Sequence, residues 1–123
     1  MILNPNSPEP IFNQIATLIK DQILDGTYSV GEQVPSTNEL SKLLQINPAT
    51  ARKGLSLLVD EEILYKKRGI GMFVCDKAPQ LIRAEKSAHF QKDYLDNMLR
   101  EAKKIGLTKN DLIRMIQTSE MED

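Results

Sequence analysis

The sequence has no tryptophan, one cysteine (Cys75) and one histidine (His89), and only 5% of its residues are aromatic. A single cysteine excludes an internal disulfide framework and favours a reducing compartment. No apolar run approaches membrane-spanning length, and residues 1–10 have neither the basic start nor the apolar stretch of a signal peptide. We therefore expect a cytoplasmic protein that has no membrane partner.

The scarce residue types also limit the chemistry that the chain can perform. No cysteine or histidine cluster surrounds His89, so we expect no metal site, and Cys75 is expected to be a packed small residue. Gly69 and Gly71 lack the third glycine and the following helix of a dinucleotide-binding turn. No nucleophile and base can be paired, so we expect neither an enzyme nor a bound cofactor.

Charge is unevenly distributed along the 123 residues, although the formal net charge is only −1. Basic residues gather at Arg52-Lys53 and again at Lys66–Arg68, while the acidic Asp60–Glu62 cluster lies between them. Such short basic clusters are compatible with a phosphate-binding face, and also with an ordinary solvated surface.

Three short helices are predicted in the first half of the chain. Residues 10–25 carry apolar side chains at helical spacing. Ser36 begins a capping box that predicts a second helix, and Asn47-Pro48 predicts the start of a third helix, which extends to about Glu61. The bend at residues 45–46 is so brief that the two helices form a helix-turn-helix.

The hydrophobic period changes after the third helix. Residues 63–67 and 72–75 are predicted strands, joined by a turn at 68–71, so that the whole pattern is a winged helix-turn-helix. The major groove of DNA admits one helix, whose first residues meet the base edges, and this requirement accounts for the arrangement. The residues expected at DNA are Ser36, Asn47, Ala49, Thr50, Arg52, Lys53, Lys67, Arg68 and Gly69.

A long helix is predicted over residues 81–105, with a heptad stripe and one polar member, Gln91. The stripe could pack on its own domain or pair with a second chain, and its small residues favour a homodimer. Gly106 ends this helix and Thr108 begins a shorter one. The residues expected in the dimer seam are Leu81, Ala84, Ala88, Leu95, Met98, Ala102 and Ile105.

The expected fold class is mainly α with a small β-hairpin. Pro79 marks a candidate boundary, which predicts a winged helix-turn-helix domain at residues 1–77 and a short all-helical dimerisation tail at residues 78–123. The tail is too short to enclose a metabolite in an ordinary pocket, so the sequence identifies no small-molecule effector.

Five segments, in order and in register, resemble the GntR family of bacterial transcription regulators. They are Pro10-Ile11-Phe12-x-Gln14-Ile15, Gly31–Ser36, Glu39-Leu40, Ile46–Lys53 and Arg68-Gly69-x-Gly71-x-Phe73-Val74. The short helical tail resembles that of the YtrA subfamily, in which the tail serves dimerisation. The chain departs from the family pattern at Asn38, often an arginine, and at Ile70 and Met72, commonly lysine and threonine in the wing.

This resemblance implies a dimeric repressor that binds a short inverted repeat. It implies DNA contacts at Ser36, Asn47, Thr50 and Arg52, and at the wing tip, Arg68-Gly69. Winged helices also serve as protein-interaction modules that do not bind DNA. The basic wing and the placement of Arg52 after Asn47-Pro48 favour DNA over that alternative.

Overall fold

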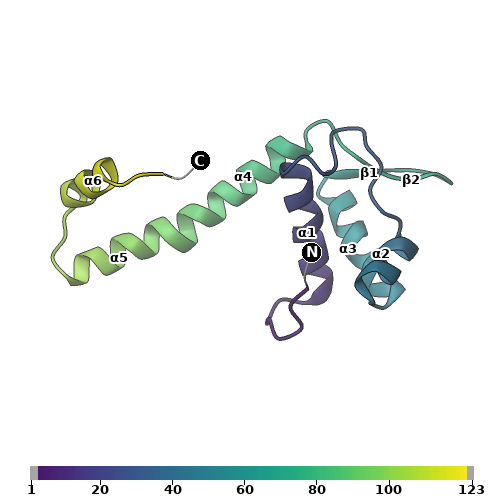
Figure 1. The fold of residues 1–123 in the computed structure, drawn as a ribbon, viewed down its shortest axis with the longest axis horizontal. Coiled ribbons are helices and arrows are strands. Elements are labelled where there is room, and N and C mark those ends of the chain that lie inside the picture. The colour runs from purple at the N-terminus through teal and green to yellow at the C-terminus, as the bar shows by residue number, and fades with distance from the viewer. Residues whose placement is uncertain (1–2, 122–123) are drawn as a thin grey trace. The chain divides into compact units, whose positions relative to one another are not determined.

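A computed structural model describes residues 3–121, which divide into two compact units between Ala84 and Glu85. The first unit contains α1 (Ile11–Leu24), α2 (Thr37–Leu44), α3 (Pro48–Asp60) and the strands β1 (Leu64–Lys67) and β2 (Gly71–Val74). The division falls within α4 (Ala78–Phe90), and η1 (Gln91–Leu95), α5 (Asp96–Lys104) and α6 (Lys109–Thr118) follow (Figure 1). The predicted fold class, a mainly helical winged helix-turn-helix with an all-helical tail, is confirmed.

The core of the first unit forms where α1 and α3 pack against each other (Figure 1). Ile15 from α1 and Leu55 and Leu58 from α3 are at most 1% exposed. Burying each such side chain contributes about 1.5–3 kcal/mol. Gly54 allows the close approach of the two helices, since a Cβ atom there would lie 3.0 Å from the Ile15 side chain.

The bend between α2 and α3 depends on Gln45, whose φ of +53° is left-handed. This conformation costs a non-glycine residue about 1–2 kcal/mol. The hydroxyl of Ser41 donates to the Ile46 carbonyl at 2.6 Å, and the Ile46 amide donates to the Ser41 carbonyl at 3.0 Å. Leu43 in α2 is 69% exposed, because Leu40 is the residue of this helix that turns to the core.

The hairpin is antiparallel and in register from Leu64 opposite Val74 to Lys67 opposite Gly71. Leu64 and Val74 are buried in the core of the first unit, which anchors the base of the hairpin there. The loop segment 31–34 pairs with β2 through backbone hydrogen bonds. The hairpin is therefore braced from one side by a segment far away in the sequence.

The first unit extends beyond the boundary predicted at residues 77 and 78. Ala78 and Ile82 are fully buried and belong to the same core as α1 and α3. Pro79 lies in the first turn of α4, where its missing amide hydrogen costs no helical hydrogen bond. The proline therefore begins a helix instead of separating two domains.

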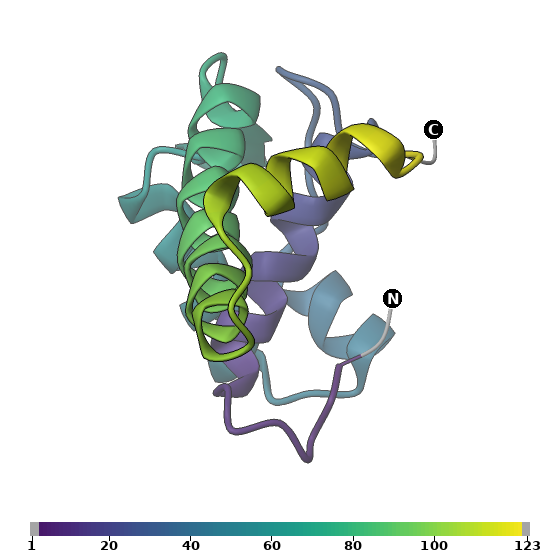
Figure 2. The ribbon, with the colours of Figure 1, turned by 90° about the vertical axis from the view of Figure 1, so that its left-hand side faces the viewer.

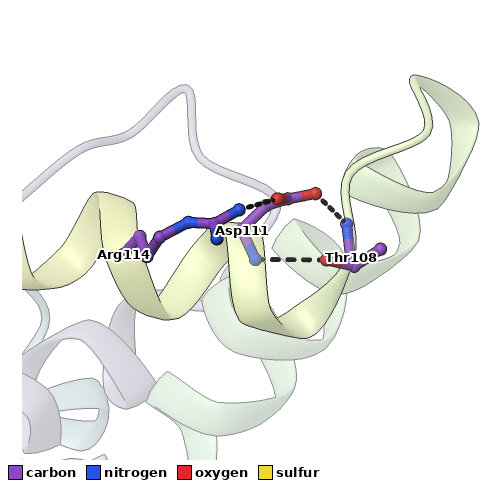
Figure 3. Close-up of polar contacts among 3 residues, drawn as sticks. All are labelled: Thr108, Asp111 and Arg114. Carbon is purple, nitrogen blue, oxygen red and sulfur yellow. Dashed lines mark hydrogen bonds and ion pairs between the residues drawn. The ribbon is translucent and has the colours of Figure 1, made fainter.

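In the second unit, α6 follows α5 after a loop, as the yellow helix in Figure 2 shows. Thr108 and Asp111 form a capping box at the start of α6. The Thr108 amide donates to Asp111 Oδ2 at 2.8 Å, and the Asp111 amide donates to the Thr108 hydroxyl at 3.1 Å (Figure 3). Arg114 forms an ion pair with the same carboxylate. Among the residues of this unit that the structure describes, Ala102 and Leu112 are buried.

The predicted heptad helix is interrupted by a π-helical turn, η1, at Gln91–Leu95. A π turn forms i→i+5 hydrogen bonds and shifts the following residues around the axis by roughly one position. The π turn falls between Ala88 and Leu95, so these two residues are not spaced as in a regular α-helical heptad. Ala102 is only 5% exposed, whereas Leu95 and Met98 are 38% and 37% exposed, and Ile105 is 73% exposed.

Candidate nucleic-acid interface

A cleft of about 410 Å³ opens between the start of α2, the outer face of α3 and one face of the hairpin. We call it the α3–hairpin cleft. Apolar side chains of α3 and β2 line part of it, and polar and basic side chains line the rest. The lining residues are Ser36, Thr37, Asn38, Arg52, Leu55, Ser56, Val59, Asp60, Lys66, Gly71 and Met72.

The outer face of α3 supplies one wall of this cleft. Arg52 and Ser56 are exposed there at i, i+4 spacing, while Ala51 and Leu55 on the inner face are buried. Ala49, one turn earlier, is exposed as well. One side of α3 thus faces outward along its first two turns, and its other side is held by the core.

Both helices of the motif begin at a capped residue. The Ser36 hydroxyl accepts from the Glu39 amide at 3.1 Å, and Asn47 Oδ1 accepts from the Ala49 amide at 2.8 Å. The Ser36 amide donates to the Glu39 carboxylate, and this bond, with that from the hydroxyl, lowers the pKa of Glu39. These oxygen atoms therefore serve to orient the helices. An anion at either helix start can be bound by the first-turn amides that the caps do not use and by the helix dipole.

Lys53 does not line the α3–hairpin cleft, although it directly follows Arg52. Its ammonium lies 4.0 Å from the centre of the Phe12 ring, at the start of α1. A cation over an aromatic face at this distance is an attractive contact. The expected DNA residue Lys53 is thus placed on the α1 side of α3, with its charge already in contact with an aromatic ring.

The three basic residues of the hairpin point in different directions. Lys66 lines the α3–hairpin cleft together with Met72, its partner across the strands. Lys67 lies on the other face, where its ammonium is 4.4 Å from the centre of the Phe73 ring, which stacks on Tyr65. Sequence reasoning selected Lys67 and missed Lys66. The alternation of strand side chains could have identified it, because Lys66 shares a face with the buried Leu64.

The tip of the hairpin is formed by Arg68 and Gly69. The Ile70 amide donates to the Lys67 carbonyl at 3.0 Å, which closes the turn. Gly69 has a φ of +78°, a conformation that glycine adopts without strain. Arg68 and Ile70 are both exposed, so the expected wing-tip residues do project from the hairpin.

The α3–hairpin cleft has a mixed but accessible charge pattern. Arg52 and Lys66 contribute positive charges, and Asp60 contributes a negative charge at the C-terminal end of α3. Among the salt bridges of residues 3–121, none pairs Arg52 or Lys66 with a carboxylate. Both cations are therefore available to an anionic ligand. Asn38 and Ser56 also line the cleft, and neither had been selected as a site residue.

The described residues give no support for a metal site, a reactive cysteine or a membrane-spanning helix. Residues 3–121 contain no group of histidine, cysteine and acidic side chains that could hold a metal ion. Cys75 is partly buried, and burial together with the charges of Glu62 and Asp76 raises its pKa, which disfavours the reactive thiolate. No described helix has the length and apolar character needed to cross a bilayer.

Comparison with known proteins identifies one family. The model of bacterial regulatory proteins of the gntR family matches residues 12–74. YhcF, an uncharacterized HTH-type transcriptional regulator of Bacillus subtilis, is 29% identical over 112 residues, or 91% of each chain. YurK of the same organism, also uncharacterized, is 37% identical over 82 residues, and the match spans 67% of this chain but only 33% of YurK. The repressor YtrA of B. subtilis is 33% identical over 76 residues, 62% of this chain and 58% of YtrA.

Solved structures agree with this match. A GntR family transcriptional regulator from Listeria monocytogenes is 27% identical with a TM-score of 0.72, over 94% of this chain and 99% of that one. The DNA-binding domain of AraR, solved in complex with operator ORX1, is 28% identical with a TM-score of 0.55, over 61% of this chain and 93% of that domain.

Proposed function

Because the chain belongs to the gntR family of bacterial regulatory proteins and is a YtrA-like, DNA-binding transcription regulator, we propose that it represses transcription as a homodimer bound to an inverted-repeat operator. Repression is supported by the names of YtrA and of NagR, a B. subtilis repressor that is 39% identical over 74 residues. The inverted repeat follows from two-fold symmetry, because a closed dimer presents two identical DNA-binding units.

The observation that carries the proposal is the α3–hairpin cleft. The exposed start of α3 and the projecting hairpin flank it, and Arg52 and Lys66 line it without a carboxylate partner. A helix in the major groove and a wing in the neighbouring minor groove leave a sugar-phosphate strand between them. We propose that this strand passes along the cleft, where both cations reach its phosphates or adjacent base edges.

Different residues then have different tasks at the DNA. Arg52, Thr50 and Ala49 at the start of α3 face the bases, where arginine reads guanine and alanine contacts a thymine methyl group. Ser36 and Asn47 hold the helix starts, whose amides contact phosphate. Arg68 and Gly69 approach the minor groove. Lys53 and Lys67, placed over aromatic rings, would contribute positive charge and no base readout.

The dimer is proposed to form through the tail predicted at residues 78–123, which follows the DNA-binding domain predicted at residues 1–77. The start of this tail, at Ala78 and Ile82, also packs in the core of the DNA-binding unit. Support comes from apolar side chains that the described tail leaves exposed. Large patches of this kind are seldom tolerated on a monomer. Ala102 is buried within the tail, so its contribution to the seam is indirect. The candidate seam residues that remain exposed are Leu81, Ala84, Ala88, Leu95, Met98 and Ile105.

The proposed role also bears on where the protein acts and on what it needs in order to act. A regulator of bacterial transcription acts in the cytoplasm, where the DNA lies, and needs neither a membrane nor an enzymatic activity. A cofactor is not required. The alternative, a winged-helix module that binds only proteins, is disfavoured because the unpaired cations and the exposed recognition helix gather at one cleft.

Selection of bound sequences from random duplex DNA tests this function. The proposal predicts recovery of two copies of a short motif in inverted orientation, with binding that weakens as salt concentration rises. Arg52→Ala in the same selection should lose or relax one base position in each half-site. Enrichment of no sequence, under conditions in which the chain is folded, would contradict the proposal and favour the protein-interaction module.

A further inference from the structure

The loop segment 31–34 forms an incomplete third strand beside the hairpin. The Gly31 amide donates to the Val74 carbonyl at 2.9 Å, and the Val34 amide donates to the Met72 carbonyl at 3.0 Å. Gln33 lies between them and forms an antiparallel bridge with Phe73. The segment leads through Pro35 directly into the cap of α2. The hairpin is thus linked to the segment that starts the helix-turn-helix.

The side chain of Gln33 extends this link to the hairpin tip. Its amide nitrogen, Nε2, donates to the carbonyl of Ile70 at 2.9 Å, across 37 residues of sequence. Ile70 is the last residue of the turn that carries Arg68 and Gly69. Backbone bonds fix the base of the hairpin, and this bond is the contact that reaches from segment 31–34 to its tip.

The backbone at the next residue is shaped to admit the Gln33 side chain. Gly71 has a φ of +150°, and a Cβ atom there would clash with Gln33 Nε2 and lie 3.2 Å from Gln33 Cδ. A side chain at this position would displace the amide from Ile70. The glycine and the glutamine are therefore complementary.

We infer that Gln33 is a positioning residue that holds the hairpin tip, and with it Arg68 and Gly69, in the orientation used on DNA. The inference rests on the proposed function. A two-stranded hairpin is marginally stable alone, so its tip samples many orientations unless something else restrains it. If the tip is already held in place in the free protein, DNA binding no longer includes the free-energy cost of ordering it.

The size of the effect follows from the strength of one hydrogen bond. A single exposed bond changes an equilibrium constant by roughly two- to tenfold. Gln33→Met removes the donor and keeps the length of the side chain. We expect it to weaken binding to the selected duplex by about that factor. The denaturant midpoint should fall only slightly, because Gln33 is exposed and outside the core, so the folded state loses only this one bond.

Two measurements separate positioning from a general structural role. The first compares backbone NMR order parameters of residues 68–70 in the free wild-type chain and in Gln33→Met, and we expect lower values at these residues only. The second repeats the DNA titration in an Arg68→Ala background. If Gln33 acts through the tip, the loss caused by Gln33→Met shrinks there, because the contact that it positions is already absent.

Unchanged order parameters, or an equal loss of affinity in both backgrounds, would overturn the role of Gln33 while the wild-type chain still binds its selected duplex. Failure of the wild-type chain to bind any duplex would overturn the proposed function itself, and with it the positioning role. The two failures are therefore distinguished by the wild-type titration alone.

Discussion

Lys66 and Lys67 are adjacent in β1, yet their side chains lie on opposite faces of the hairpin. Lys66 lines the α3–hairpin cleft with Arg52, whereas the Lys67 ammonium lies 4.4 Å from the centre of the Phe73 ring. Both residues are exposed, and both carry the same charge. Any difference between them in DNA binding therefore reports which face of the hairpin meets the phosphates.

This relationship gives a matched pair of variants. Lys66→Ala should weaken binding about equally for all sequences and reduce the slope of log affinity against log salt by about one, since one phosphate contact is lost. Lys67→Ala removes the same charge from the other face and should have the smaller effect. The measurement is a titration of one labelled duplex at several salt concentrations. A larger loss of DNA affinity for Lys67→Ala than for Lys66→Ala would show that the DNA contacts the opposite face of the hairpin from the one proposed.

Arg52→Ala should reduce specific binding without changing stability. Arg52 is exposed on α3, whereas Leu55 and Leu58 are buried, so removal of the Arg52 side chain leaves no cavity in the core. Loss of a base contact costs about 1–3 kcal/mol, roughly ten- to a hundredfold in affinity. Titrations with the selected site and with a scrambled duplex check this, and Lys109→Ala in α6 serves as the control for charge loss. Equal affinity of Arg52→Ala and wild type for the selected site would show that α3 is not the recognition helix.

Two truncations test where the first unit ends. Ending the chain after Asp76 removes Ile82, which is 0% exposed in the core, and should destabilise the unit by about 2–5 kcal/mol. Ending it after Ala84 keeps this residue and should leave a folded unit. If the tail joins two chains, the second product should be monomeric and bind DNA roughly a hundredfold more weakly. Urea unfolding and sedimentation measure both properties, and a product ending at Ala84 that remains dimeric would exclude the tail as the seam.

The capping box at α6 predicts a pH dependence within the tail. Hydrogen bonds from the Thr108 amide and hydroxyl, and the contact with Arg114, lower the pKa of Asp111 below 3.8. A carboxylate whose pKa is depressed by folding stabilises the fold above its unfolded value, and that contribution is lost as pH falls through the folded value. The start of α6 should therefore fray below about pH 4. Amide exchange of residues 109–112 measures this, and Asp111→Asn should remove the pH dependence.

Sequence patterns predicted those parts of the fold that depend on local repetition. The helical spacing of apolar residues between positions 10 and 25 predicted α1, and the capping box at Ser36 marked the start of α2. These features follow from helical periodicity and from hydrogen bonds between residues three apart. They were predicted correctly because no distant part of the chain is needed to form them.

Features that depend on tertiary contacts were not predicted. Nothing local shows that the Lys53 ammonium lies over Phe12, or that Ile82 completes a core begun at α1. The π turn at Gln91–Leu95 was missed because heptad counting assumes a constant helical repeat. The choice of Lys67 over Lys66 differs from these cases. The alternation of side chains along the strand would have predicted that Lys66, and not Lys67, lies on the same face as Leu64.

Two chains are expected to bind one symmetric operator, each through its α3–hairpin cleft. Sedimentation equilibrium of the full chain with a labelled duplex that carries the selected site tests it most directly, because it gives the mass of the complex. We predict two chains on one duplex, and the loss of that species when either half-site is scrambled. One chain bound to an asymmetric site, with no loss on scrambling the second half, would contradict the account.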